Sequence, residues 1–344
     1  MSRQAAVRPG VAPAGAVGVG SVRAGPAALF DRVLLWLALA AFSVTGASWL
    51  ARTAWLFELF THFRFQLAAG AVLLLAAALV RRRARTAALA LLVMLANGMP
   101  LLPYLSGGIA EAATTTPAAL ELMTANVHYR NDNYAALLEQ VRREDPDVLG
   151  LLEVDQAWLD ALAPLEAEYR WRVQYPQPDP WGLALYSKLP VEELAVSPYR
   201  EAGVNTAILV KVEVGDTPVT LALAHVSAPT TPGKARLRNL QLGRLAELLS
   251  DREGPRILAG DLNITPWSPY YQDLAAAAGL TNAARGVGYL PTWPAGFNPF
   301  KIPIDHCLVS DEVRVVSFRT GDTFDSDHLP VLVQLVPEGG LRAE

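Results

Sequence analysis

Three long apolar runs near the start of the chain constrain its fold more than any other feature. They cover residues 33–50, 65–80 and 86–105, and none of them contains a charged residue. A helix of about 20 apolar residues can cross the hydrocarbon core of a bilayer. Buried helices of a soluble domain are the alternative, and a cleaved signal peptide would account for the first run alone. We predict three transmembrane helices within residues 29–106.

Arginine residues are distributed unevenly around these runs. The first 117 residues contain ten Arg and no Lys against three acidic residues, a net charge of +7, whereas the rest of the chain carries −11. Four Arg lie within residues 3–32 and four within residues 81–85, but the loop between the first two runs has only two. Because positively charged loops stay in the cytoplasm, the pattern predicts a cytoplasmic N-terminus and an extracytoplasmic segment after residue 110.

Composition divides the rest of the chain into further parts. Residues 1–28 are rich in Ala, Gly and Pro and are predicted to be a disordered tail, and residues 107–117 form a linker. Residues 118–337 alternate strand and helix patterns and are predicted to be one α/β domain, with a tail at 338–344. The single Cys307 cannot form an intrachain disulfide, and no Cys/His cluster has the spacing of a structural zinc site.

The α/β domain contains both hairpins and helical crossovers. Residues 133–145 and 233–251 have helical patterns between apolar strands. A hairpin is predicted at residues 182–196, turning at 188–190, and a second at residues 205–227, turning at Gly215 and Asp216. This mixture predicts two mixed β-sheets packed face to face, with helices on the outside.

Polar side chains end one apolar strand after another in this domain. A single Asn or Asp at such a position is explained by turn formation, but their recurrence favours one site built on the loops at the sheet ends. Asp261 and Asn263 are two residues apart, so in an extended segment both side chains point into the same pocket. The full set is Asn126, Glu153, His225, Asp261, Asn263, Asp305, Asp327 and His328.

Short phrases within the domain resemble those of a known superfamily. In order they are TANV, LLEV, AHVS, GDLN, IDHCLV and SDHLPV, and they span residues 124–331. They resemble the endonuclease/exonuclease/phosphatase superfamily, which includes DNase I, apurinic endonucleases, inositol-polyphosphate phosphatases and bacterial sphingomyelinases. The resemblance implies a DNase I-like four-layer α/β sandwich in a bacterial, membrane-anchored member. The family often has Gln before the glutamate, where this chain has Leu152.

The resemblance also implies a divalent cation. Glu153 would be the main ligand of Mg²⁺ or Mn²⁺, with Asn126 and Asp327 in or near its coordination shell. Mg²⁺ prefers few carboxylates and several waters, so two or three oxygen-bearing side chains suffice.

The remaining residues would act on the substrate and water. His328 would be the general base, and Asp305 would orient it. Asp261 and Asn263 would position the attacking water and the phosphate, and His225 would face the leaving group. A neutral imidazole can take a proton from water when a carboxylate fixes its tautomer.

The other histidines are not predicted to be catalytic, and the loop tryptophans can line the substrate groove or pack in the core. These residues are His62, His128 and His306, and Trp181, Trp267 and Trp293.

The sequence therefore predicts a membrane-anchored, metal-dependent phosphoesterase. It would hydrolyse a phosphodiester or phosphomonoester with activated water, and anchoring in a bacterial inner or plasma membrane favours an envelope or lipid-type substrate. Two alternatives are a membrane-tethered nuclease acting on extracellular DNA and an inactive binding scaffold. A domain with a net charge of −11 lacks the basic surface of a typical nucleic-acid binder.

Overall fold

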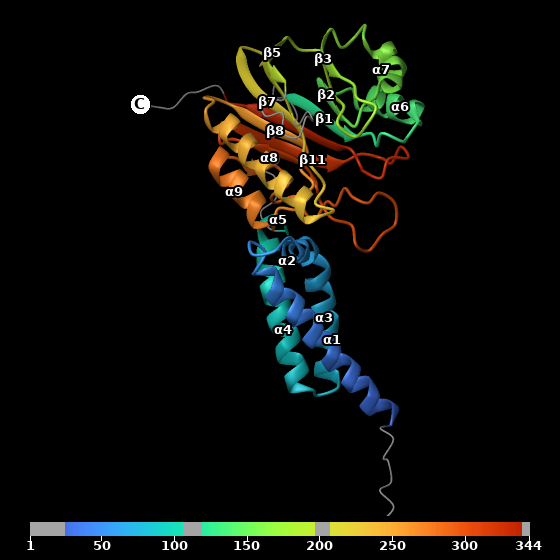
Figure 1. Cartoon of the computed structure of the whole chain (residues 1–344), viewed down its shortest axis with the longest axis vertical. Coiled ribbons are helices and arrows are strands. Elements are labelled where there is room, and N and C mark those ends of the chain that lie inside the picture. The colour runs from blue at the N-terminus through green and yellow to red at the C-terminus, as the bar shows by residue number, and fades with distance from the viewer. Residues whose placement is uncertain (1–24, 106–118, 197–206, 339–344) are drawn as a thin grey trace, which may run out of the picture.

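A computed structural model describes residues 25–105, 119–196 and 207–338. Most of the predicted N-terminal tail, the whole predicted linker at 107–117 and most of the C-terminal tail lie outside the described residues. Residues 25–105 form a helical bundle, and residues 119–196 and 207–338 form a sandwich domain, which lies at one end of the bundle (Figure 1).

The helical bundle contains three helices that are long and apolar enough to cross a membrane. They cover Pro26–Ser48, Trp55–Val80 and Ala84–Leu105, so the second extends back to Trp55. Large apolar side chains on them remain exposed, as expected for surfaces that face lipid. The elements are α1 (Pro26–Ser48), α2 (Trp55–Leu59), η1 (Phe60–Phe63), α3 (Arg64–Val80), α4 (Ala84–Gly98), η2 (Met99–Leu101) and α5 (Leu102–Leu105).

Two six-stranded sheets form the centre of the sandwich domain. Sheet 1 contains β1 (Leu120–Asn126), β2 (Val148–Leu152), β3 (Trp171–Tyr175), β4 (Leu183–Ser187), β11 (Val313–Thr320) and β12 (Val331–Pro337). Sheet 2 contains β5 (Val191–Val196), β6 (Ala207–Val214), β7 (Thr217–His225), β8 (Arg256–Asp261), β9 (Thr281–Asn282) and β10 (Asp305–Val309). The strand orders are β11-β12-β1-β2-β4-β3 and β5-β6-β7-β8-β10-β9.

Helices cover the outer face of each sheet and complete the four predicted layers. Sheet 1 packs against α6 (Tyr134–Glu144) and α7 (Gln156–Leu162), which continues into η3 (Ala163–Leu165). Sheet 2 packs against α8 (Pro232–Ser250) and α9 (Pro269–Ala278) (Figure 1). The apolar residues of the inner strand faces form a third core between the sheets. The fold is thus the predicted α/β sandwich of two mixed sheets.

Local sequence signals set where the covering helices begin. Thr231 caps α8 by accepting a hydrogen bond from the Lys234 N–H at 3.2 Å, and Pro232 occupies the first turn, where its missing N–H costs nothing. Asn133 caps α6 in the same way, through the Ala136 N–H. Each cap satisfies a backbone donor that has no partner inside its helix.

One of the two predicted hairpins is wrong. Strands β6 and β7 do form a hairpin that turns at Gly215, with a φ of 60°, and Asp216. Strands β4 and β5 do not pair: β4 pairs with β2 and β3 in sheet 1, whereas β5 pairs with β6 in sheet 2. The segment 188–190 therefore carries the chain from one sheet to the other. An alternating pattern shows that a strand has a buried face, but not which sheet it joins.

Candidate active site

Two polar side chains end the parallel strands of sheet 1. Asn126 is the last residue of β1, and Glu153 follows β2 directly. The amide nitrogen of Asn126 donates to Glu153 Oε1 at 3.0 Å, and the Tyr129 N–H donates to Oε2 at 3.1 Å. Glu153 has a φ of 64°, a left-handed conformation that is unfavourable for a residue other than glycine. This turn at the strand end directs the carboxylate toward Asn126.

Asp261 and Asn263 lie together in the site, but not for the reason that strand alternation suggested. Asn263 has a φ of 47°, so the extended segment expected there is replaced by a tight turn. Its backbone N–H donates to Asp261 Oδ1 at 2.8 Å and its amide donates to Oδ2 at 3.3 Å. Asn126 also donates to Asp261 Oδ2, at 3.2 Å. One amide thus joins the carboxylates of the two sheets.

His328 and Asp305 form a buried contact between a base and an acid. His328 Nδ1 donates to Asp305 Oδ2 at 2.8 Å, and His328 Nε2 lies 3.8 Å from Asp261 Oδ2. All three side chains are almost completely buried. Because Nδ1 is committed to Asp305, Nε2 is the ring atom that faces the remaining site.

His225, the last residue of β7, faces both carboxylates at the sheet ends. Its Nε2 lies 3.8 Å from Glu153 Oε1 and 3.7 Å from Asp261 Oδ2. The ring of Trp181 lies against the imidazole, with 5.4 Å between the ring centroids. Nδ1 of His225 is buried and makes no hydrogen bond with another protein atom. Nε2 is therefore the nitrogen of His225 that is directed into the site.

Asp327 stands at the exposed edge of the site, with 46% of its side chain accessible. Its Oδ2 accepts from the Trp293 indole at 3.0 Å, and its Oδ1 lies 3.8 Å from His128 Nδ1. The His128 N–H in turn donates to Asn126 Oδ1 at 3.0 Å. In this arrangement the amide nitrogen of Asn126, not its oxygen, faces Glu153. The direct cation ligation implied for Asn126 would need the opposite orientation, and it stays a prediction.

Burial and neighbouring charges shift the pKa values of Asp261, Asp305 and His328. Burial and the nearby Asp305 raise the pKa of Asp261 to about 6. Burial alone would also raise the pKa of Asp305, but the charge and hydrogen bond of His328 lower it below its usual value. Burial opposes the charge of His328, yet Asp305 and Asp261 raise its pKa to about 10. These carboxylates favour a positive charge beside them, because an opposite charge stabilises the ionised form.

The donor set is suited to a hard divalent cation. The site offers the carboxylates of Glu153, Asp261, Asp305 and Asp327, and Mg²⁺ prefers such oxygen ligands. Ligand atoms of Asp261, Asp305 and His328 lie within 4.8 Å of one another. However, the nearest atoms of Asp305 and His328 are already hydrogen-bonded to each other. Glu153, whose side chain is 13% exposed, is more accessible to a cation than Asp261 or Asp305, at 2% and 5%.

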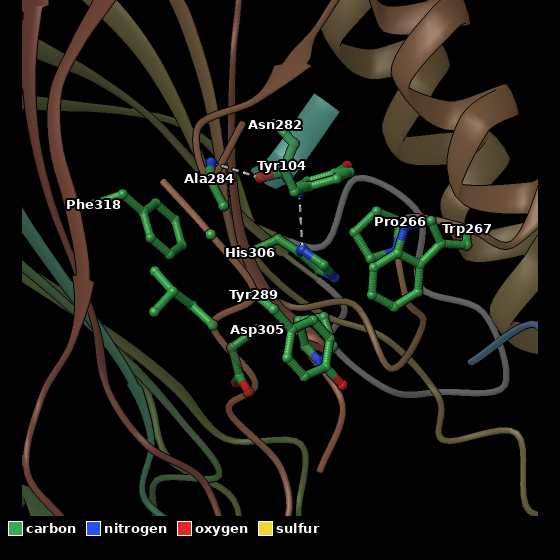
Figure 2. Close-up of a pocket in the computed structure, with 12 residues that line it drawn as sticks. Tyr104, Pro266, Trp267, Asn282, Ala284, Tyr289, Asp305, His306 and Phe318 are labelled. Atoms are coloured by element: carbon green, nitrogen blue, oxygen red, sulfur yellow. Dashed lines mark hydrogen bonds between the residues drawn. The ribbon is translucent and has the colours of Figure 1, made fainter. Parts of the chain in front are cut away.

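His306, the neighbour of Asp305 in β10, lies on the other side of the strand. Figure 2 shows its ring beside Pro266 and Trp267, directed away from the Asp305 carboxylate. His306 Nε2 donates to the Ile264 carbonyl at 2.7 Å, and Nδ1 accepts from Asn282 at 3.3 Å. Burial lowers the pKa of His306 to about 4, so the ring is neutral and structural.

The pocket drawn in Figure 2 is too small for a substrate. Its volume is about 20 Å³, which is room for roughly one water molecule. Its lining includes Tyr104 of the helical bundle together with Asp305 and His306 of β10. Glu153 and Asp327 do not line this pocket, and their side chains are 13% and 46% exposed.

Several residues that complete the site were not predicted. Ser326 Oγ donates to the Asn126 carbonyl at 2.7 Å and accepts from the His328 N–H at 3.1 Å, so it joins β1 to the His328 loop. Thr292 Oγ1 accepts from the Asp305 N–H at 3.2 Å. Ser326 could have been found from its place in the phrase SDHLP, but nothing in the sequence around Thr292 indicates its role.

Comparison with known proteins identifies a family and a fold. Residues 123–328, well over half of the chain, match the Endonuclease/Exonuclease/phosphatase family. The matched segment begins in β1 and ends at His328, and it contains all eight of the predicted site residues. A search among curated proteins gives no match.

Solved structures share the fold at low sequence identity. Truncated Caenorhabditis elegans TDP2 is 20% identical, with a TM-score of 0.52, over 63% of this chain and 98% of that chain. D. rerio TDP2 complexed with a single-strand DNA product is 16% identical, with a TM-score of 0.53, over 63% and 99%. A functionally unknown conserved protein from Enterococcus faecalis V583 is 18% identical, with a TM-score of 0.52, over 64% and 100%. At these identities the likeness shows the fold alone.

Proposed function

Because the chain belongs to the endonuclease/exonuclease/phosphatase family, we propose that its sandwich domain hydrolyses a phosphoester with water activated by His328. The observation that carries this proposal is the fixed imidazole between two buried carboxylates. Asp305 holds Nδ1 at 2.8 Å, and Nε2 faces Asp261 at 3.8 Å. That spacing allows one water molecule to contact both His328 Nε2 and the Asp261 carboxylate.

The chain's own residues divide the chemistry between them. His328 Nε2 takes the proton from the attacking water, and Asp305 stabilises the imidazolium that results. Asp261 orients the water as a hydrogen-bond acceptor. The amide of Asn263 and the imidazole of His225, which both lie beside Asp261 Oδ2, provide polar contacts for the phosphate and its leaving oxygen.

Glu153 is the residue we propose as the main ligand of Mg²⁺ or Mn²⁺, with Asp327 and Asn126 beside it. When bound, the cation would neutralise phosphate oxygens and lower the high pKa of His328 toward the range of a useful base. The four carboxylates of the site would otherwise repel an anionic phosphate. Substrate binding should therefore depend on the cation.

The proposed location is a membrane, with the N-terminus in the cytoplasm and the sandwich domain outside. Arginine clusters at residues 3–32 and 81–85 support this orientation, and a bacterial inner or plasma membrane is the proposed setting. Reporter fusions at residue 84 and residue 115 should give cytoplasmic and external signals, respectively. The reverse pattern would place the sandwich domain in the cytoplasm.

A loop at residues 289–301, which we call the bridging loop, supports a substrate at the membrane surface. At one point it contacts the active site, where Trp293 donates to Asp327. At its ends it contacts α3, where Gln66 donates to the Lys301 carbonyl at 2.8 Å and Tyr289 stacks on a phenylalanine ring. Phe297, between these contacts, is fully exposed, and Figure 1 shows the loop extending beside the end of the bundle. We propose a lipid-type or envelope phosphoester as the substrate.

A nuclease acting on extracellular DNA is the second candidate. The D. rerio TDP2 structure with its single-strand DNA product gives this alternative a precedent in the same fold. The net charge of −11 after residue 117 opposes it, because DNA affinity rests mainly on basic residues that contact phosphates.

Turnover by the full-length protein in lipid nanodiscs tests these alternatives. Phospholipid, single-stranded DNA and a soluble phosphodiester are offered with Mg²⁺ or Mn²⁺, and the His328→Ala variant is the control. We expect metal-dependent hydrolysis of the phospholipid or soluble diester, and its loss in the variant. Faster cleavage of DNA would favour the nuclease. Tight cation binding without turnover of any substrate would favour the inactive scaffold.

A further inference from the structure

A buried ion pair joins the helical bundle to the sandwich domain. Glu58 of α2 and Arg238 of α8 are both completely buried, and Arg238 Nη2 donates to Glu58 Oε2 at 2.5 Å. The other carboxylate oxygen of Glu58 accepts from Ser268 Oγ at 2.8 Å. Figure 1 shows α2 at the junction between the two regions, below α8 and α9. Glu58 thus reaches out of the bundle into the sandwich domain.

The same guanidinium contacts the active-site turn. Arg238 Nη1 donates to the Asn263 carbonyl at 3.1 Å. Asn263 has the left-handed φ of 47° and binds both oxygens of Asp261. A continuous set of hydrogen bonds therefore runs from Glu58 through Arg238 and Asn263 to Asp261, which faces His328.

A second contact from the bundle holds the next part of this turn. His62 Nδ1 hydrogen-bonds Thr265 Oγ1 at 3.0 Å, and both side chains are buried. Glu58 accepts from Ser268 and His62 binds Thr265, so the bundle contacts residues 265 and 268 directly, and it contacts residue 263 through Arg238 of α8. His306 of β10 donates to the Ile264 carbonyl. Side chains of α2, η1, α8 and β10 thus hold the turn after β8.

The energetics of burial indicate that this ion pair does more than attach the two regions. A buried ion pair often stabilises a fold no better than apolar residues of the same volume, because removing both charges from water is costly. What such a pair provides is a defined geometry. The exposed pair Arg52–Asp273 joins the same two regions, but within the described part of the chain Asp273 of α9 makes no side-chain hydrogen bond to residues 261–268.

We propose that the helical bundle is a working part of the active site, with Glu58 and Arg238 as positioning residues for Asn263 and Asp261. The inference rests on the proposed hydrolytic function and extends it. The helical bundle then does more than tether the sandwich domain to a membrane. Through Glu58, Arg238 and Asn263 it holds Asp261, which orients the attacking water. A change in the packing of α2 would therefore change catalysis directly.

The test compares full-length variants in lipid nanodiscs. Glu58→Gln removes the buried charge, and Arg52→Ala is the matched control because it breaks the exposed pair at the same interface. We expect Glu58→Gln to lower kcat by about 10–100-fold, since small misplacements of reacting groups have effects of this size. KM and cation affinity should change less than about threefold, because Glu153 is held by Asn126 and Tyr129 instead. Arg52→Ala should leave kcat within about twofold of wild type.

A double variant separates positioning from stability. Glu58→Leu with Arg238→Met replaces the ion pair by apolar side chains and should keep the thermal midpoint near that of wild type, but kcat should be low because the loss of Arg238 leaves the Asn263 carbonyl without its donor. Recovery of kcat together with the thermal midpoint would overturn the proposal. So would an unchanged kcat in Glu58→Gln.

Backbone hydrogen exchange in residues 261–268 provides a readout that does not depend on turnover. Exchange there should rise in Glu58→Gln and not in Arg52→Ala. If the wild type hydrolyses no phosphoester, the proposed function fails, and the exchange experiment still decides the positioning role. Equal exchange in wild type and Glu58→Gln would reject that role.

Discussion

The two sheets of the sandwich domain have the same strand pattern but different surroundings. In each sheet a parallel pair joined by a helix is flanked on both sides by antiparallel strands: β1 and β2 with α6, and β7 and β8 with α8. The end of each pair carries two polar side chains. These are Asn126 and Glu153 in sheet 1, and His225 and Asp261 in sheet 2.

The carboxylate at the end of the sheet 2 pair is more buried and more tightly held than the one at the end of the sheet 1 pair. The side chain of Asp261 is 2% exposed, against 13% for Glu153, and only the sheet 2 half receives Arg238 and the bundle residues behind it. This difference suits a division of labour. An accessible carboxylate on sheet 1 can take a cation from solution, whereas buried carboxylates on sheet 2 can control a proton on His328.

The largest effect on turnover is expected from a change at His328, whose proton the buried carboxylates of sheet 2 control. His328→Ala should lower kcat by about 10²–10⁴-fold, because it removes the general base. Cation affinity should stay within about threefold of wild type, since the proposed ligand Glu153 belongs to the other half. Turnover of a soluble phosphodiester and calorimetry on the same samples measure both quantities. Unchanged turnover would remove His328 from the mechanism.

Asp305→Asn should lower kcat by less than His328→Ala does. The imidazole remains, but it loses the carboxylate that fixes its tautomer and supports its charge. Asp305 raises the pKa of His328, so its replacement lowers that pKa. Because the base must be unprotonated to act, the acidic limb of the kcat–pH profile should move to lower pH. A limb that moves to higher pH would contradict the assignment of His328 as the base.

Glu153→Ala should weaken cation binding, because it removes the proposed main ligand at the end of the sheet 1 pair. We expect cation affinity to fall at least about tenfold, since changes even beyond the direct ligands cost 10–100-fold. In wild type, a cation at 100 times its Kd should stabilise the fold by about 2.7 kcal/mol, and a chelator should reverse this. The variant should lose most of that stabilisation. Glu168→Ala, at an exposed surface position, is the control and should behave as wild type.

Periodicity and short motifs predicted the elements well but not their partners. Asn126, Glu153 and Asp261, which the phrases TANV, LLEV and GDLN contain, lie at or directly after strand ends in the structure. The strands around residues 188–190 were also predicted, yet they belong to different sheets. Strand alternation reports which face is buried, whereas sheet membership depends on contacts distant in sequence.

The sequence also does not reveal the partner of a polar group when that partner lies far away along the chain. In the sequence Glu58 is simply the one acidic residue between the first two apolar runs, whereas in the structure its buried partner is Arg238. The pairing of one carboxylate with one of many arginines has no local sequence signal. Asn263 shows a local limit as well, since an Asn can continue a strand or adopt a left-handed turn. The structure decides between these through the contacts of the Asn263 backbone with Asp261 and Arg238.

The smallest expected effect tests whether the exposed edge of the site meets a lipid surface. Phe297→Ser removes the fully exposed aromatic ring of the bridging loop. Complete burial of such a side chain contributes about 1.5–3 kcal/mol, so partial insertion at an interface should change kcat/KM by about 3–10-fold. The loss should appear with a phosphodiester embedded in the nanodisc and not with a soluble one. Leu240→Ser, at a half-exposed apolar position on α8, is the matched control and should affect neither substrate. An equal loss with both substrates would mean that the loop shapes the active site through Trp293 and Asp327, and no loss with either would place the substrate away from the membrane.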